Sequence, residues 1–268
     1  MNMTPDPESL RSLMAEIPPT LLAGRRVLVT GGARGLGLAF AKCIAQAGGR
    51  VVIADILAEL AASEAAALRG QGHEVHALAL DLTDPASVTA CADEAVRLLG
   101  GLDGLVNNGA ITNSGGRDPH ALEIEMWDRV MDVNVRGTWL MSRACHGALA
   151  ASGRGAIVNL ASDTALWGAQ NLLAYVASKG AVAAMTRSLA REWGGANITV
   201  NAIAPGLTLV EATEYVPKAR HDKYLEGRAL PREQQAADVC GAVLFALSPL
   251  SRFVTGQLLP VNGGFVLN

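Results

Sequence analysis

Short apolar runs alternate with longer segments of helical periodicity along most of this 268-residue chain. The apolar runs are rich in Val, Ile, Leu and Ala, as is typical of strands buried on both faces of a sheet. Strands are expected at 27–30, 51–54, 75–80, 104–107, 156–160, 199–203 and 257–261. Helices are expected at 37–47, 57–68, 85–99, 127–150, 173–193 and 235–247. This alternation predicts an α/β fold with a doubly wound, seven-stranded parallel sheet flanked by helices.

Two segments depart from this alternation. Residues 1–23 are rich in proline and acidic residues and lack a basic start followed by an apolar run, so we expect an N-terminal extension without a signal peptide. Within it, residues 8–17 have helical spacing and form either a frayed tail or a helix docked on a neighbouring subunit. Residues 207–228 are polar and charged. Because no linker divides the remainder, residues 24–268 are predicted to form a single domain.

Composition and charge exclude several classes of partner. Hydrophobic residues make up 50% of the chain and aromatic residues only 4%, so the core must consist mainly of aliphatic side chains. A net charge of −3 with scattered basic residues argues against nucleic acid, and no window is apolar enough to cross a membrane. The four cysteines and five histidines show no metal-ligand spacing, so we expect no metal and buried free thiols in a reducing cytoplasm.

A glycine-rich turn indicates a nucleotide site. Residues 30–37, with the sequence TGGARGLG, lie between a predicted strand and a predicted helix. Glycines at 31, 35 and 37 allow a tight turn and let the backbone approach a pyrophosphate at the helix N-terminus. Asp55 ends the next strand, where its carboxylate can accept hydrogen bonds from the ribose hydroxyls of NAD and repel the 2′-phosphate of NADP. Arg34 could pair with that phosphate, so NADP remains the alternative.

A second motif indicates hydride transfer. Tyr175 and Lys179 are four residues apart in a predicted helix and therefore share one face. An adjacent ammonium should lower the phenol pKa from its usual ~10, so that Tyr175 can donate and accept a proton near neutrality. Ser162 would then hydrogen-bond the oxygen that is oxidised or reduced.

With these motifs in order, the chain resembles the short-chain dehydrogenase/reductase family from about residue 23 to the C-terminus. The resemblance rests on the TGxxxGxG turn, Asp55, Asp81-Leu82, Asn107-Asn108-Gly109-Ala110, Asn134, Ser162, Tyr175, Lys179, Asn201 and Pro205-Gly206. It implies a Rossmann-type fold and an enzyme that interconverts a secondary alcohol and a ketone with NAD. It also implies that residues 207–228 form a substrate lid and that the enzyme is a cytoplasmic homotetramer or homodimer.

The resemblance assigns roles to individual residues. Asn134, Ser162, Tyr175 and Lys179 form the implied catalytic set, in which Asn134 anchors a water that links Lys179 to solvent. The implied cofactor-binding residues are Gly31, Arg34, Gly35, Leu36, Gly37, Asp55, Asp81, Leu82, Asn108, Gly109, Tyr175, Lys179, Pro205, Gly206 and Thr208. Two positions depart from the family pattern. Gly109 and Ala110 are exchanged relative to Asn-Asn-Ala-Gly, and Val210 replaces a threonine for which Thr208 or Thr213 could substitute.

The substrate and two rival functions stay open at this stage. Thr112, Asn113, Ser114, Asp163, Thr164, Trp167 and Gln170 are expected to face the substrate, which could be a secondary alcohol, a sugar or a hydroxy acid. Arg34 permits an NADP-dependent carbonyl or 3-ketoacyl reductase. The fold could also serve as a non-catalytic nucleotide-binding module, although the complete catalytic set argues against it.

Overall fold

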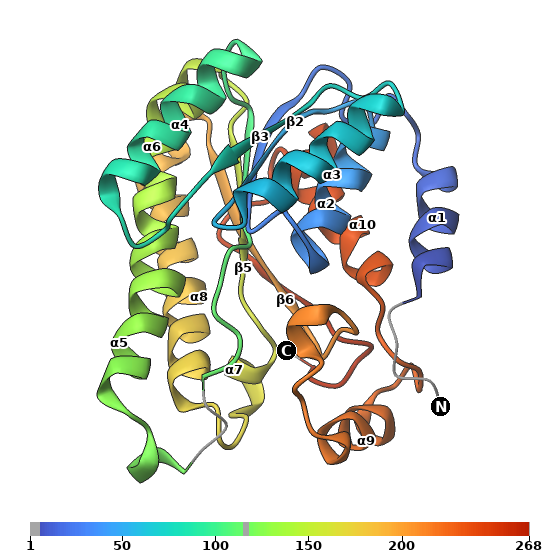
Figure 1. The fold of residues 1–268 in the computed structure, drawn as a ribbon, viewed down its shortest axis with the longest axis vertical. Helices are drawn as coiled ribbons and strands as arrows, with labels where there is room; N and C mark the ends of the chain where they lie inside the picture. The colour runs from blue at the N-terminus through green and yellow to red at the C-terminus, as the bar shows by residue number, and fades with distance from the viewer. Residues whose placement is uncertain (1–5, 115–117, 268) are drawn as a thin grey trace.

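The computed structural model describes residues 6–114 and 118–267; the start of the predicted extension, residues 115–117 and the last residue lie outside this part. Seven parallel strands form one sheet in the order β3-β2-β1-β4-β5-β6-β7 (Figure 1). They are β1 Arg26–Thr30, β2 Arg50–Asp55, β3 Val75–Ala79, β4 Gly104–Asn107, β5 Ala156–Leu160, β6 Thr199–Pro205 and β7 Leu258–Val261. The predicted doubly wound α/β fold of Rossmann type is therefore confirmed.

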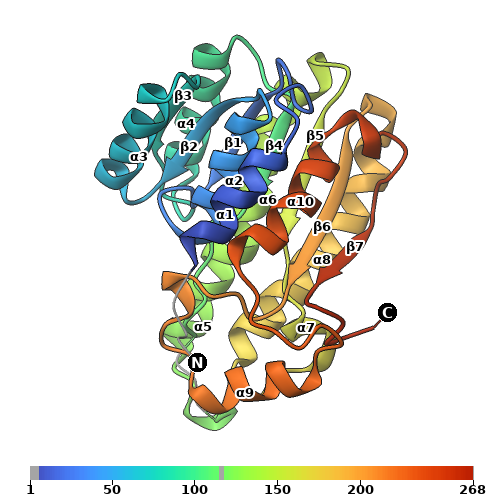
Figure 2. The same ribbon diagram turned by 90° about the vertical axis from the view of Figure 1, so that its right-hand side faces the viewer.

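Helices cover both faces of the sheet. Helices α2 (Gly35–Gln46), α3 (Ala58–Gly70) and α10 (Ala236–Leu247) share one apolar core with it, and Figure 2 looks onto this face. A second core lies on the other face, beneath α4 (Pro85–Leu99), α6 (Thr138–Ala151) and α8 (Leu173–Trp193). Among the described helices, none has the length and apolar character needed to span a membrane.

The N-terminal extension contains a docked helix, α1 (Pro7–Glu16). The Asp6 carboxylate caps it by accepting from the Glu8 amide at 2.9 Å, and the Asp6 amide donates to the Gln235 side chain at 3.0 Å. Leu10, Leu13 and Met14 pack against the core that α2 and α10 share. The helix therefore packs on its own chain and is not a frayed tail.

The helix expected at 127–150 is interrupted. It begins earlier, as α5 (Ile124–Met131), and passes through a π-helical segment, η2 (Asp132–Gly137), into α6. A Cβ on Gly137 would lie 2.8 Å from Leu82 Cβ, so the glycine allows this segment to approach the loop after β3. The wider π turn leaves no signature in a hydrophobic pattern, which explains why the sequence predicted one regular helix.

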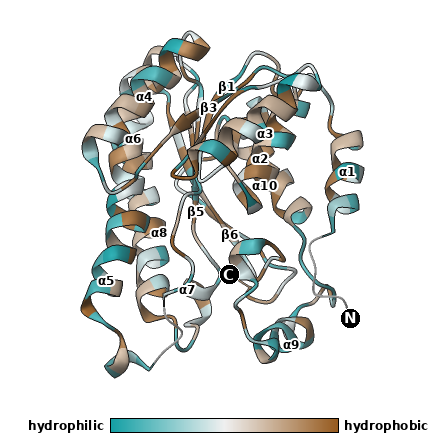
Figure 3. Ribbon diagram, viewed as in Figure 1, coloured by the Kyte–Doolittle hydropathy of each residue, from teal (hydrophilic) through white to brown (hydrophobic). Residues whose placement is uncertain are grey.

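The polar segment at 207–228 contains two short elements, η4 (Glu211–Thr213) and α9 (Lys218–Gly227). Figure 3 shows α9 as mainly hydrophilic, in contrast to the strands. In both ribbon views α9 lies at one end of the molecule beside α7 (Thr164–Trp167), the short helix that follows β5 (Figures 1 and 2).

The strand order reverses between β1 and β4, so the loops after these two strands diverge and leave a crevice at the carboxyl edge of the sheet. At the opposite edge, Asp103 is fully buried and receives hydrogen bonds from Arg26 Nε at 2.8 Å and Arg154 Nε at 2.9 Å. The functional edge and this ion cluster therefore occupy opposite ends of the strands.

Candidate active site

A cleft of about 720 Å³ opens at the carboxyl edge of the sheet. Most of the predicted site residues line it: Gly31, Arg34, Gly35, Leu36, Asp55, Asp81, Leu82, Asn108, Gly109, Ser162, Tyr175, Lys179, Pro205, Gly206 and Thr208. Gly37 and Asn134 do not line it. The fold thus brings together residues that are up to 177 positions apart in sequence, from Gly31 to Thr208.

The glycine turn after β1 forms a cradle at the start of α2. Gly31 and Gly35 adopt positive φ angles of 61° and 58°, which favour glycine. A Cβ on Gly31 would lie 2.6 Å from Gly109 Cα, and one on Gly37 would lie 2.1 Å from the Gly31 carbonyl oxygen. The absence of a side chain at Gly37 therefore allows α2 to pack closely against the turn. The backbone cradle at a helix N-terminus fits a pyrophosphate.

Asp55 is fixed at the end of β2. Its Oδ2 accepts a hydrogen bond from the Ala33 amide at 3.0 Å, and its Oδ1 accepts one from the Leu57 amide at 3.0 Å. Each oxygen keeps further acceptor capacity towards the cleft. Arg34 is exposed and has no comparable constraint on its side chain within the described hydrogen bonds. The carboxylate therefore fits the ribose hydroxyls of a dinucleotide.

The wall around the expected adenine position contains residues from the loops after β2 and β3. Hydrogen bonds from the Thr83 hydroxyl and amide to Asp81 lower the pKa of this carboxyl. Asp84, rather than Asp81, caps α4. Sequence reasoning missed Ile56 and Leu57, which line the cleft although they are 70% and 41% exposed. Two adjacent apolar residues directly after a strand-ending aspartate were the available signal.

The loop after β4 carries the exchanged residues Gly109 and Ala110. Asn108 Nδ2 donates to the carbonyls of Thr30 at 3.1 Å and Gly31 at 2.9 Å, and the Gly109 amide donates to Thr30 Oγ1 at 3.0 Å. The loop is thereby tied to the glycine turn, and Ala110 joins the cleft lining.

Ser162, Tyr175 and Lys179 meet where β5 ends and α8 begins. The Ser162 and Tyr175 side chains both line the cleft, and Ser162 Oγ accepts a hydrogen bond from Thr164 Oγ1 at 2.9 Å. Lys179 Nζ donates to the Leu160 carbonyl at 2.6 Å and lies 5.7 Å from the centre of the Tyr175 ring. The spacing of Tyr175 and Lys179 on one helix thus places a phenol and an amine on one side of the cleft.

Burial controls the ionisation of both groups. It raises the pKa of Tyr175, and the neighbouring Ser162 hydroxyl acts in the opposite direction. It lowers the pKa of Lys179 to about 8. The expected net lowering of the Tyr175 pKa is therefore not found in this arrangement, because desolvation of the phenolate dominates. At neutral pH, Tyr175 is a phenol.

Asn134 lies in η2, buried behind the cleft. Its Oδ1 accepts from the Ile111 amide at 2.8 Å, and its Nδ2 donates to the Ile111 carbonyl and the Ser178 hydroxyl, each at 3.0 Å. The side chain therefore joins the loop after β4 to α8 at the residue preceding Lys179. This position fits a role for Asn134 in supporting the amine of Lys179.

The 207–228 segment crosses the cleft and is held to the β4 loop. Thr112 Oγ1 donates to the Ala212 carbonyl at 3.0 Å, and the Tyr215 hydroxyl donates to the Thr112 carbonyl at 2.7 Å. Thr208 and Thr213 both line the cleft, but the Thr213 hydroxyl donates to the main chain, including the Thr208 carbonyl at 2.7 Å. Sequence reasoning did not identify Tyr215 as part of the site.

Several residues expected to face the substrate lie elsewhere. Thr112 and Asn113 line the cleft, but Ser114, Asp163, Thr164, Trp167 and Gln170 do not. Asp163 is fully buried, and the Trp167 ring packs against Tyr224 and Phe265. The interval between the serine and the tyrosine therefore turns towards α9 and the C-terminal segment, which the sequence pattern alone could not indicate.

Comparison with known proteins defines the family. A family model described as enoyl-(acyl carrier protein) reductase matches residues 31–266. The chain belongs to the short-chain dehydrogenase/reductase family. It is 38% identical to the 3-alpha-(or 20-beta)-hydroxysteroid dehydrogenase of Mycobacterium tuberculosis over 245 residues, which cover 91% of this chain and 90% of the relative. It is 37% identical to the cyclopentanol dehydrogenase of Comamonas testosteroni over 244 residues, 90% of this chain and 97% of the relative.

A solved structure supports the same assignment to the short-chain dehydrogenases/reductases. The gluconate 5-dehydrogenase from Burkholderia cenocepacia, in complex with NADP and tartrate, matches with a TM-score of 0.88 and 33% identity, covering 93% of this chain and 98% of that one. The protein is accordingly an oxidoreductase that acts on CH–OH groups with a nicotinamide cofactor, and the sequence-based prediction of family and enzyme class is confirmed.

Proposed function

We propose that this protein is an NAD-dependent dehydrogenase that interconverts a secondary alcohol and a ketone, with Tyr175 as the acid/base. The observation that carries the proposal is that Ser162, Tyr175 and Lys179 line the same cleft as the glycine cradle and Asp55. When bound, the nicotinamide supplies the hydride acceptor. Tyr175 takes the hydroxyl proton during oxidation and returns it during reduction, while Ser162 hydrogen-bonds the substrate oxygen.

Lys179, beside Tyr175 in the cleft, and Asn134, buried behind it, support this chemistry. The buried amine of Lys179 is held by the Leu160 carbonyl and has a pKa of about 8, so it carries most of its charge at neutral pH. That charge stabilises the phenolate form of Tyr175, which accepts the proton of the alcohol, and its position suits contact with the nicotinamide ribose. Asn134 holds the loop and helix that flank it.

The preference for NAD follows from Asp55. Two backbone amides fix its carboxylate at the cleft, where a 2′-phosphate would bring a second negative charge against a buried anion. The exposed Arg34 offers only a screened interaction with such a phosphate. Because the gluconate 5-dehydrogenase relative binds NADP, the two cofactors must be compared directly.

A fluorescence titration with NADH and NADPH tests this preference. We expect NADH to bind at least about 10-fold more tightly, equivalent to about 1.4 kcal/mol. Asp55→Asn should reduce the ratio by removing the charge, whereas Arg34→Gln should leave it almost unchanged. Tighter binding of NADPH, with the preference lost in Arg34→Gln, would support the NADP-dependent carbonyl or 3-ketoacyl reductase instead.

We propose a neutral cyclic alcohol as the substrate class. Side chains that the β4 loop and the lid contribute to the cleft are mostly uncharged, including Ile111, Thr112, Ala212 and Tyr215. Two relatives are named for a hydroxysteroid and for cyclopentanol, both cyclic alcohols. A panel of cyclopentanol, cyclohexanol, a hydroxysteroid and gluconate with NAD would test the class. Turnover confined to gluconate would contradict it.

Replacement of Tyr175 tests the chemistry. Tyr175→Phe should reduce turnover by at least about 100-fold, the lower end expected for loss of a general acid/base, while NADH binding is retained. Tyr215→Phe makes the same chemical change elsewhere in the cleft and should alter KM more than kcat. Undiminished turnover in Tyr175→Phe would exclude the proposed role. NADH binding without turnover of any alcohol or ketone by the unchanged protein would favour a nucleotide-binding module.

We also propose a cytoplasmic homotetramer or homodimer. Exposed apolar side chains on α10 and the turn that follows it, Phe245, Leu250 and Phe253, offer a surface for association. The four cysteines are free and buried, which fits a reducing compartment. Light scattering on the purified protein would decide the state, and a monomer at micromolar concentration would contradict the proposal.

A further inference from the structure

The lid helix α9 is attached to the loop that carries Ser162 by a buried hydrogen bond. The Tyr224 hydroxyl donates to Asp163 Oδ1 at 2.6 Å. Asp163 directly follows Ser162 in the chain and is fully buried, and Tyr224 is only 2% exposed. Tyr224 of α9 is thus linked through Asp163 to Ser162 in the cleft.

Aromatic packing fixes the direction of this bond. The Tyr224 ring stacks on Phe265, with centroids 4.3 Å apart and planes inclined by 28°. Trp167 packs edge-on against Tyr224, and its indole N–H donates to the Tyr224 hydroxyl at 3.3 Å. Because the hydroxyl accepts from the indole, its own proton is directed to Asp163.

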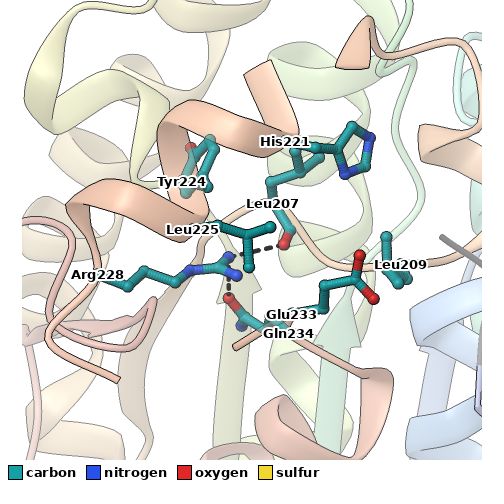
Figure 4. A pocket seen from close by; sticks show the side chains of 8 residues that line it. All are labelled: Leu207, Leu209, His221, Tyr224, Leu225, Arg228, Glu233 and Gln234. Atoms are coloured by element: carbon teal, nitrogen blue, oxygen red, sulfur yellow. Dashed lines mark hydrogen bonds between the residues drawn. The ribbon is translucent and has the colours of Figure 1, made fainter. Parts of the chain in front are cut away.

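Both ends of the lid are fixed by one buried arginine. The Arg228 guanidinium donates to the Leu207 carbonyl at 2.8 Å and to Gln234 Oε1 at 3.1 Å (Figure 4). Leu207 begins the lid segment and Arg228 ends it. The cavity that these residues border is only about 10 Å³, too small for a ligand. With the ends fixed, movement of α9 requires the contact with Asp163 to break.

We propose that Asp163 and Tyr224 form a latch that keeps α9 closed and positions Ser162 for catalysis. Asp163 also donates its amide to the Pro205 carbonyl at 3.0 Å, so the latched loop is braced against the end of β6. Opening of α9 would leave a buried acceptor without its donor, which favours the closed form. This inference rests on the proposed function, in which Ser162 contacts the substrate oxygen. Asp163 and Tyr224 act through Ser162 and are positioning residues.

The hydrogen bond accepted by Asp163 distinguishes the latch from ordinary packing. Burial raises the pKa of Asp163 to about 6, against the effects of the Tyr224 hydrogen bond and the nearby Arg228 charge. The carboxylate therefore needs its donor, whereas an amide at this position would keep an acceptor for Tyr224 without the charge. Asp163→Asn is thus the conservative variant that retains the bond.

Trypsin cleavage and steady-state kinetics test the latch together. Lys218, Arg220 and Lys223 lie in α9, so the rate of cleavage there measures opening without any substrate. Tyr224→Phe keeps the stacked ring and removes only the donor. We expect cleavage to accelerate by at least about 5-fold, the lower limit for an unsatisfied buried acceptor. With cyclopentanol and NAD, kcat should fall by a similar factor while the Kd for NADH is unchanged.

Two further variants separate the latch from a general loss of structure. For Asp163→Asn, the rate of trypsin cleavage and kcat should both stay within about 2-fold of the values for the unchanged protein, because the retained hydrogen bond preserves the closed form. Glu226→Gln alters an exposed position of the same helix and should change neither measurement. If Tyr224→Phe does not fold, Phe265→Leu removes the stacked partner and should still accelerate cleavage.

The outcomes are distinct. The latch is overturned if Tyr224→Phe has the same cleavage rate and the same kcat as the unchanged protein. It is also overturned if cleavage is faster but kcat is unchanged, because the contact with Asp163 would then not position Ser162. For Phe265→Leu, unchanged cleavage would have the same meaning. Failure of the unchanged protein to oxidise any alcohol would overturn the proposed function alone, since the cleavage rates would still judge whether Tyr224 holds α9 closed.

Discussion

Tyr175 is buried where its phenolate is disfavoured, and this environment sets the direction of its pH dependence. Oxidation requires the phenolate to accept a proton, whereas reduction requires the phenol. Since burial raises the pKa, the phenol predominates at neutral pH and the phenolate fraction grows about 10-fold for each pH unit below that pKa. We therefore expect kcat/KM for cyclopentanol oxidation to rise from pH 6 to about 8, where Lys179 begins to lose its charge, and that for cyclopentanone reduction to stay level over the same range.

Tyr215→Phe provides the control for this pH profile, because its hydroxyl bonds only the Thr112 carbonyl among the described contacts. Its oxidation profile should have the same slope as that of the unchanged protein. An oxidation rate independent of pH over this range would show that another group limits proton transfer. Such a result would leave Ser162 and Lys179 as the groups to examine.

Individual site residues were predictable to different degrees. Tyr175 and Lys179 were identified because helical spacing carries positional information within one element. The pairing of Tyr224 with Asp163 was not, because it joins residues 61 positions apart and depends on how α9 packs. The error over the Tyr175 pKa has a similar origin, since the sequence reveals a neighbouring amine but not the extent of burial.

Close packing of elements explains the glycine at the start of α2. A methyl group on Gly37 would meet the Gly31 carbonyl oxygen at 2.1 Å, and backbone cannot move aside as a side chain can. Gly37→Ala is expected to destabilise the fold by about 1–3 kcal/mol and to weaken NADH binding. Urea unfolding and NADH titration would measure both effects.

Gly147→Ala is the matched control within a helix. A Cβ at Gly147 in α6 meets no atom within 4 Å, so alanine should be neutral or stabilise the helix by up to about 1 kcal/mol. Equal stability of the two variants would contradict the packing argument for Gly37.

The strands could be predicted from their continuous apolar runs, and most helices from a repeating apolar face. The π segment η2 was missed because its effect depends on the contact between Gly137 and Leu82, not on periodicity. The docking of α1 was equally hidden. Its apolar face was visible in the sequence, but the α2–α10 surface that receives it is formed only by the fold.

The stability of the whole molecule should depend on the buried carboxylate at the far edge of the sheet. Burial alone would raise the pKa of Asp103, but hydrogen bonds from Arg26 and Arg154 outweigh it and hold the pKa at about 2. The resulting stabilisation is present above the unfolded pKa of ~3.9 and is lost as pH falls towards 2. Its size is about 2 kcal/mol.

Asp103→Asn should therefore lower the free energy of unfolding at pH 7 by at least this amount, because two guanidinium groups lose their shared partner. Urea unfolding of both proteins at pH 7 and pH 3 would measure the difference, which should shrink at the lower pH. An equal difference at both values would assign the effect to packing instead of charge.

The division of the cleft between the two halves of the chain has a consequence for its evolution. Gly31, Asp55 and Asp81 come from β1 to β3, whereas Ser162 and Tyr175 come from β5 and α8. On the proposed assignment, a mutation before residue 100 can change which nucleotide the enzyme uses. Mutations after residue 100 can change which alcohol it oxidises. Descendants of one ancestral gene can thus diversify in these two properties separately.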